Sequence, residues 1–138
     1  MTKSHLIPLT LDVSAQFCRE VIDMAITGYS PNWGEFDVTK RTEPDEHEIT
    51  YPDRLRVDEF GDGDTPLSTC EIGTAEIAEG MRRVLLGDMT DKADHAQAAP
   101  HYAAAILHAI REGDTAHIDA DTADVIMQAA ALGRIVYA

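Results

Sequence analysis

Apolar and polar residues alternate along the middle of the chain with a period of two, which is typical of β-strands. Three segments show this alternation, at residues 33–42, 48–60 and 65–72. Short acidic or glycine-rich turns separate them, so we expect them to pair as an antiparallel meander. A further edge strand is predicted from His5 to Val13, where strand-forming residues surround Pro8.

Apolar residues spaced three and four positions apart predict four helices on either side of these strands. We expect them from Ser14 to Thr27, between Gly73 and Gly87, from His101 to Glu112 with Pro100 suited to the first turn, and from the Asp119–Asp121 region to Gly133. Ser14, Thr74 and either Asp119 or Asp121 are placed to accept hydrogen bonds from the free N–H groups of a first helical turn. Residues 88–99 show weak periodicity and are expected to be a loop.

The last helix has an apolar stripe and a polar side. The stripe consists of Ala123, Val125, Ile126, Ala129, Ala130 and Leu132. Asp121, Asp124 and Gln128 fall on the opposite side, and the aspartates also suit the positive end of the helix dipole. The tail that follows, 134–137, is short and mostly apolar, so we expect it to return to the core.

These elements predict a single α+β domain spanning residues 1–138, with a three- to four-stranded antiparallel sheet packed against four helices. Trp33 is expected to begin a strand and fill one end of the core. Cys18 and Cys70 are expected to be reduced core residues. No apolar run approaches the length needed to cross a bilayer, and the N-terminal stretch is a poor signal peptide, so we expect a cytoplasmic protein without membrane contact.

Charge is the unusual property of the composition, because 25 acidic residues oppose 11 basic ones and give a net charge of −14. Such a surface repels nucleic acid and anionic lipid and attracts basic protein surfaces. Two explanations remain open from composition: a surface adapted to high salt and a surface that imitates a polyanion. The alternative to a decoy is a solvated acidic surface that only maintains solubility.

The acids gather in three runs, at 43–48, 58–64 and 114–124. If these runs project from one side, they present carboxylates as a duplex presents phosphates, and a nucleic-acid-binding protein would accept them as a decoy. The residues predicted to contact such a partner are Glu43, Asp45, Glu46, Glu48, Asp58, Glu59, Asp62 and Asp64.

Motifs for catalysis are missing from the sequence. There is no Gly-x-Ser-x-Gly elbow, no phosphate-binding loop and no Cys/His signature, so we predict no catalytic residue and no cofactor. Asp58 and Glu59 do not form an acid–base dyad, because adjacent strand residues face opposite sides.

Metal binding is a weaker alternative. A calcium loop beginning at Asp62 would need oxygen ligands at Pro66 and Gly73, so that motif fails. Asp119, Asp121 and Asp124, together with a histidine, could hold a hard cation, although helix capping already explains the aspartates. The remaining zinc candidates are His101 and His108, seven residues apart, and a loop set consisting of Asp88, Asp91 and His95.

Three stretches carry a resemblance to known sequences: DADTADVIMQAAALGRIVY at 119–137, TAEIAEGMRRVL at 74–85, and the Gly-Tyr to Trp stretch at 28–33. They resemble small acidic proteins of unknown function from phages and actinobacterial mobile elements. In those relatives the tail has Phe-Gly and a final Gly, where this chain has Leu132-Gly133 and Ala138. The resemblance implies no catalytic residues. It implies a genomic context in which small acidic proteins often inhibit host defence, some by DNA mimicry.

Three hypotheses follow for the function. The first is a non-enzymatic inhibitor, of anti-CRISPR or anti-restriction type, that occupies the basic nucleic-acid-binding groove of a defence complex in the host cytoplasm. The second is a structural or assembly module that forms a homodimer through its C-terminal tail. The third is a metal-dependent enzyme that uses Asp119, Asp121, Asp124 and a histidine.

Overall fold

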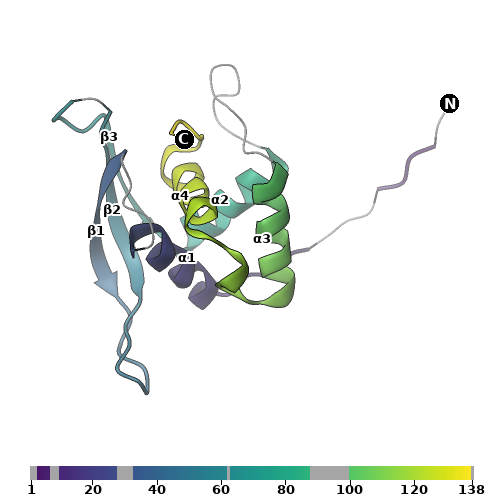
Figure 1. The fold of residues 1–138 in the computed structure, drawn as a ribbon, viewed down its shortest axis with the longest axis horizontal. Helices are drawn as coiled ribbons and strands as arrows, with labels where there is room; N and C mark the ends of the chain where they lie inside the picture. The colour runs from purple at the N-terminus through teal and green to yellow at the C-terminus, as the bar shows by residue number, and fades with distance from the viewer. Residues whose placement is uncertain (1–2, 7–9, 28–32, 62, 88–99, 138) are drawn as a thin grey trace.

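The computed structural model describes residues 3–6, 10–27, 33–61, 63–87 and 100–137. This part of the chain has the predicted α+β architecture, in which four α-helices pack on one face of a three-stranded antiparallel sheet (Figure 1). The elements are α1 (Ala15–Thr27), β1 (Gly34–Arg41), β2 (Pro52–Glu59), β3 (Ser68–Gly73), α2 (Thr74–Leu86), α3 (Pro100–Glu112), the 3-10 helix η1 (Thr115–His117) and α4 (Ala120–Leu132).

The sheet is the expected meander, with β2 between β1 and β3. Leu55 and Val57 of β2 are buried and belong to the hydrophobic core, as the alternating pattern predicts. On the other face Arg56 lies opposite Asp37 of β1 and Glu71 of β3. Rows of opposite charge stabilise an exposed sheet face, so this face needs no helix to cover it.

The prediction of an edge strand from His5 to Val13 is wrong for the residues of this segment that the structure describes. Residues 5–6 and 10–13 have no strand structure, and 7–9 lie outside the described residues. Leu11 and Val13 instead line a groove beside α2 and α3. Their apolar side chains are therefore partnered by helices, and the segment leaves the domain on the side away from the sheet (Figure 1).

Helix α4 lies at the centre of the helical layer, in contact with α1, α2, α3 and β3. All eight residues from Thr122 to Ala129 are buried. The prediction of a polar side for α4 is therefore wrong at Asp124 and Gln128, because other elements cover this helix all round, whereas Asp121 in its first turn is exposed. The polar side chains that α4 buries must therefore find hydrogen-bond partners inside the protein.

Gly80 sets how closely α2 approaches α4. A Cβ atom at this position would lie 2.8 Å from the Ile126 carbonyl oxygen and 3.0 Å from the Cβ of Ala130. Only glycine leaves room for this backbone contact. The two helices therefore pack closer together than any larger residue would allow.

Helix ends follow the predicted capping at most positions. The Ser14 hydroxyl accepts the Phe17 N–H at 3.0 Å, and Asp119 accepts the Thr122 N–H at 2.7 Å. Thr74 is not the cap of α2, because Gly73 precedes the helix and donates its N–H to the Glu76 carboxylate at 3.1 Å. Gly87 and Gly133 adopt the expected left-handed conformation, with φ of 67° and 70°.

Both cysteines are free, Cys18 buried and Cys70 half-buried, as predicted. Burial raises the pKa of the Cys18 thiol to about 11, so at neutral pH it is a protonated packing residue and not a nucleophile. Trp33, at 2% exposed, fills the predicted place in the core. Across the described ranges, no helix has the length and apolar character that spanning a bilayer would require.

Candidate functional site

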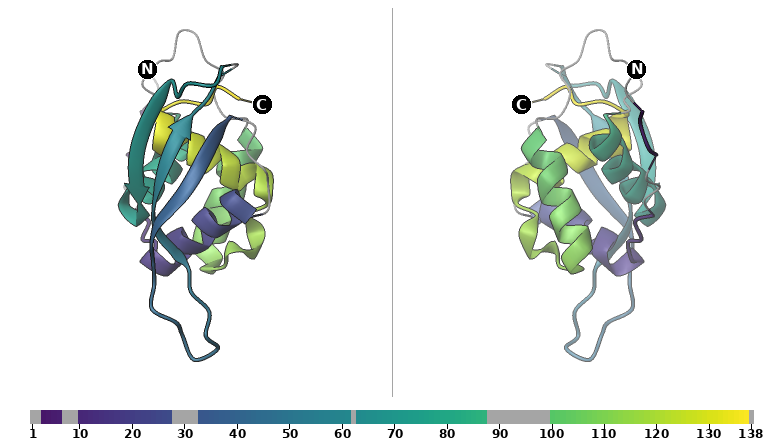
Figure 2. Two further views of the ribbon diagram at one scale, coloured as in Figure 1. Left: turned by 90° about the vertical axis from the view of Figure 1, so that its left-hand side faces the viewer. Right: turned by 90° about the vertical axis from the view of Figure 1, so that its right-hand side faces the viewer.

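A hairpin loop at residues 42–51 joins β1 to β2 and extends beyond the end of the helical layer (Figure 2). Hydrogen bonds between Thr42 and Tyr51 close its base. The four acids predicted for this loop are all exposed, and they are Glu43, Asp45, Glu46 and Glu48. The structure therefore brings the first acidic run together on one projecting turn.

The side chain of Asp45 fixes the shape of this turn. One of its carboxylate oxygens accepts the N–H groups of His47 and Ile49 at 2.8 and 2.9 Å. Glu48 takes a left-handed backbone conformation with φ of 61°, which is uncommon for a residue other than glycine. Asp45 therefore has a structural role, and it holds the three neighbouring glutamates in a defined loop.

Asp58 and Glu59 were predicted to contact a partner, but both are buried. Asp58 accepts a hydrogen bond from Thr69 and pairs with Arg56 at 3.4 Å. Glu59 accepts hydrogen bonds from Ser68 and from the Tyr137 hydroxyl, the latter at 2.6 Å. These carboxylates are engaged within the chain, so the surface available to a partner does not include them.

The rest of the second acidic run lies in the connection between β2 and β3. Asp64 is exposed there, whereas Asp62 lies outside the described residues. The loop set Asp88, Asp91 and His95 also lies outside them. The exposed part of the predicted binding set therefore consists of the hairpin-loop acids and Asp64.

A buried polar network joins the start of the sheet to α4. Asp124 is 7% exposed and Gln128 is fully buried. One Asp124 oxygen accepts the indole N–H of Trp33 at 2.9 Å, and the other accepts the Gln128 amide at 2.9 Å. Both oxygens of the buried carboxylate have donors, which is what its burial requires.

The same glutamine fixes the C-terminal tail. Its Oε1 accepts the N–H groups of Val136 and Tyr137 at 3.0 and 2.9 Å, and its Nε2 donates to the Tyr137 carbonyl at 2.9 Å. The Tyr137 ring stacks on Trp33 with centroids 5.7 Å apart. The tail returns to the core as predicted, so the surface assigned to tail-mediated dimerisation is largely used inside the chain. Sequence reasoning missed this network, although the four-residue spacing of Asp124 and Gln128 was visible.

The aspartates of the metal hypothesis are not brought together. Asp119 caps α4, and the Thr122 N–H lowers the pKa of its carboxyl. Asp121 accepts the Tyr102 hydroxyl at 2.8 Å, and this bond raises the pKa of Tyr102 to about 12. Asp124 belongs to the buried network. Within the described ranges, no three His, Cys, Asp or Glu residues are grouped so that they could hold a metal ion.

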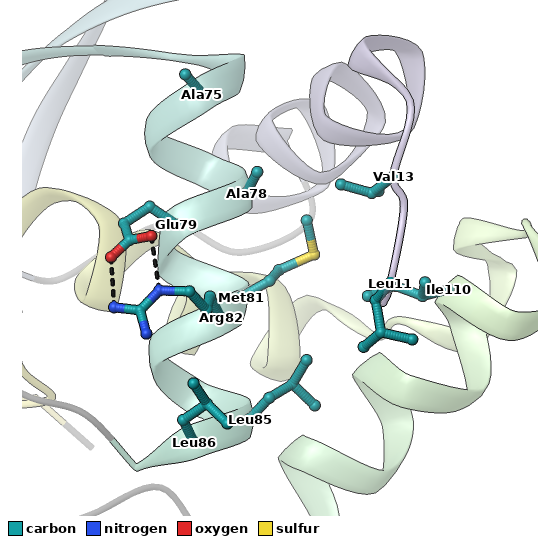
Figure 3. Close-up of a pocket in the computed structure, with 10 residues that line it drawn as sticks. All are labelled: Leu11, Val13, Ala75, Ala78, Glu79, Met81, Arg82, Leu85, Leu86 and Ile110. Atoms are coloured by element: carbon teal, nitrogen blue, oxygen red, sulfur yellow. Dashed lines mark hydrogen bonds and ion pairs between the residues drawn. The ribbon is translucent and has the colours of Figure 1, made fainter. Parts of the chain in front are cut away.

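A second surface feature is apolar. A groove of about 520 Å³ runs between α2, the segment before α1 and the end of α3 (Figure 3). Leu11 and Leu86 at its mouth are 46% and 68% exposed. Glu79 and Arg82 form a bidentate ion pair on its rim (Figure 3). Arg82 hydrogen bonding lowers the pKa of Glu79 to about 2, so the pair stays charged across the physiological range.

Comparison of the chain with protein-family models, curated proteins and solved structures finds no match. A function must therefore be argued from the surfaces themselves. Among the described residues, the acidic hairpin loop and the apolar groove both present unusual chemistry to solvent.

Proposed function

We propose that this protein is a non-enzymatic binding protein whose acidic hairpin loop occupies a basic, nucleic-acid-binding surface on another protein. The observation that carries the proposal is the exposure of Glu43, Glu46 and Glu48 on one turn that projects past the helices. Arginine and lysine side chains that bind phosphate also bind carboxylate, often by two parallel hydrogen bonds. The loop therefore offers the chemistry that a phosphate-binding surface recognises.

Within the described residues, arginine and lysine side chains leave these glutamates available. Arg54 and Arg56 on the adjoining strand pair with Glu71 and Asp58. Among the described residues, the hairpin-loop acids form one ion pair, in which Glu46 Oε1 lies 3.6 Å from Nε2 of the neighbouring His47. A net charge of −14 adds a long-range field that attracts a basic partner and repels nucleic acid.

The resemblance to small acidic proteins of mobile elements suggests which class of protein the hairpin loop binds. We propose a host defence complex that binds DNA or RNA, of the kind targeted by anti-CRISPR or anti-restriction inhibitors. By occupying the basic groove, the hairpin loop would exclude the nucleic acid that the complex must bind. No reaction and no cofactor enter this proposal.

The test is capture from a nuclease-treated bacterial lysate on the immobilised full chain. We expect a nucleic-acid-binding protein to be retained at low salt, to elute when duplex DNA is added, and to elute when ionic strength is raised to about 0.5 M, where exposed charges are screened. Competition by DNA is the decisive part, because acidic surfaces also retain basic proteins nonspecifically. A retained partner that duplex DNA and salt both leave in place would contradict the proposal.

The apolar groove favours a second candidate, the assembly module. Here the contact would be a second copy seated groove to groove, where Glu79 of one copy lies near Arg82 of the other and local charge is balanced. Light scattering over a range of concentrations tests it. We expect dimers that Leu86→Asp converts to monomers, whereas Leu107→Asp outside the groove leaves them intact; a monomer at every concentration would eliminate this candidate.

A further inference from the structure

Two exposed histidines from different elements meet at the surface of the protein. His108 lies on α3 and His117 ends η1, and their ring centroids are 4.1 Å apart at an interplanar angle of 70°. Both side chains are exposed. Within the described residues, neither imidazole takes part in a hydrogen bond or an ion pair. Their ring nitrogens are therefore free to bind a ligand from solvent.

The backbone around the pair is held rigidly. Gly113 turns the chain with φ of 64°, and the Asp114 N–H bonds to the Ala109 carbonyl at 3.1 Å. The Asp114 carboxylate then accepts the Ala116 N–H at 2.9 Å, which fixes the first turn of η1. Thr115 donates to Glu20 of α1 at 2.7 Å. The fold thus brings the two imidazoles together. With the backbone fixed, only rotation about the side-chain bonds is needed to orient the ring nitrogens.

Sequence spacing points to a different pair. Seven residues separate His101 from His108, which brings them to nearly the same side of α3. In the structure His101 contacts Tyr102, with ring centroids 4.1 Å apart, while His108 contacts His117. The turn at Gly113 reverses the chain and creates a neighbour that helical spacing does not predict.

We infer that His108 and His117 together bind a divalent transition metal ion, with copper preferred over nickel and zinc. Neutral imidazole is a ligand for all three metals, and copper heads the general order of affinity. Two imidazoles on a fixed backbone act as a chelate. The fold has already restricted the motion of the second imidazole, so its binding to the metal costs little further entropy. Water completes the coordination, and the net charge of −14 concentrates cations at this surface.

The alternative is that the rings only pack against each other as aromatics do. Substitution by phenylalanine separates the two explanations, because Phe keeps an aromatic ring in place and removes both nitrogens. His108→Phe and His117→Phe are therefore the informative variants. His47 and His101 are exposed histidines elsewhere on the chain, and their alanine variants are matched controls.

The experiment is titration of the full chain, free of any polyhistidine tag, with CuCl₂, NiCl₂ and ZnCl₂ by calorimetry. We expect one equivalent of metal to bind more tightly than any further equivalents, and copper to bind more tightly than nickel or zinc. Either Phe variant should weaken the binding of this first equivalent by roughly tenfold or more, as happens when groups that support a metal site are lost. His47→Ala and His101→Ala should bind as the parent does. The inference is overturned if the Phe variants bind as well as the parent, or if the control variants lose as much affinity.

Discussion

The chain contains two acid-rich stretches that look alike in sequence and behave differently in the fold. The stretch at 43–48 lies on a hairpin turn, where its acids are exposed. The stretch at 119–124 begins a helix, where each of its aspartates has a partner inside the chain. In the amino-acid composition, the acids of both stretches add to the negative charge in the same way. In the structure the three aspartates of the helix start accept hydrogen bonds within the chain, whereas the glutamates of the hairpin turn are exposed.

Backbone geometry explains the difference. A helix start presents free N–H groups, and Asp119 satisfies one of them. The helix then carries Asp124 into the interior, where Trp33 and Gln128 must supply donors. A hairpin turn needs one such acceptor, and Asp45 is that residue, so its neighbouring glutamates remain in solvent. Whether an aspartate or glutamate is available to a partner thus depends on the backbone around it.

The largest effect on stability is expected at Asp124, the buried aspartate of the helix start. Asp124→Ala leaves the Trp33 N–H and one Gln128 bond without an acceptor, and we expect a loss of about 3 kcal/mol of unfolding free energy. The matched variant Asp121→Ala, three residues away and exposed, should lose about 1 kcal/mol or less. Urea denaturation of both variants measures the difference. Equal losses would mean that Asp124 is not the buried centre of the network.

A packing variant tests how closely α4 is enclosed. Gly80→Ala places a Cβ 2.8 Å from a carbonyl oxygen of α4, and we expect a loss of about 1–3 kcal/mol from the forced separation of the helices. Gly63→Ala, in the β2–β3 connection, meets no atom within 4 Å and should be neutral. Thermal melting of the two variants gives the comparison. A stabilised Gly80→Ala protein would show that the close contact between α2 and α4 is absent.

The helix cap should have an intermediate effect that depends on pH. Asp119→Ala removes the acceptor of the Thr122 N–H, at a cost of about 1 kcal/mol at neutral pH. Because the folded pKa of Asp119 is lowered, its contribution is complete above the unfolded pKa, near 4, and is lost as pH falls through the folded value. The stability gap between parent and variant should therefore shrink on acidification.

Asp119→Asn is the control for this pH dependence. Asparagine also caps helices but carries no charge, so most of the stability should remain and the gap to the parent should be small at neutral pH. Denaturation midpoints of the three proteins, measured at neutral pH and at about pH 3, check both statements. A gap that widens in acid would reverse the sign and refute the assignment.

The smallest effect on stability is expected in the hairpin loop. Replacing Glu43, Glu46 and Glu48 together by glutamine should change unfolding free energy by about 0.5 kcal/mol or less, because these side chains are exposed. Asp45→Ala should cost more, since two N–H groups lose their acceptor. Circular dichroism melts of the two proteins give the ranking. If the glutamine variant proved the less stable, the glutamates would have a structural role.

Much of the fold could be predicted from local sequence. The period-two segments became three strands, the four helices formed where predicted, and Ser14, Asp119 and Gly133 fixed helix ends through short-range hydrogen bonding or backbone freedom. Trp33 was placed correctly because a lone large aromatic in a small domain is most stable when buried. These signals act within a few residues, so they can be read along the chain.

What could not be predicted depended on contacts between distant segments. Asp58 and Glu59 looked like surface acids until Thr69 and Tyr137 were brought beside them. The polar side of α4 was misassigned because nothing local shows that other elements cover a helix on every side. The segment ending at Val13 has strand-like alternation, yet its apolar residues pack against helices. In each case the partner belongs to another element of the fold.

The most direct test of the central claim is the dissociation constant for the captured partner, measured with two charge-matched variants. One carries glutamine at Glu43, Glu46 and Glu48; the other carries Asp12→Asn, Asp23→Asn and Glu112→Gln, outside the hairpin loop. If the loop is the binding element, the first variant should bind roughly tenfold or more weakly at low salt, and the second within about twofold of the parent. Equal weakening of both would show that net charge, and not the hairpin loop, accounts for binding.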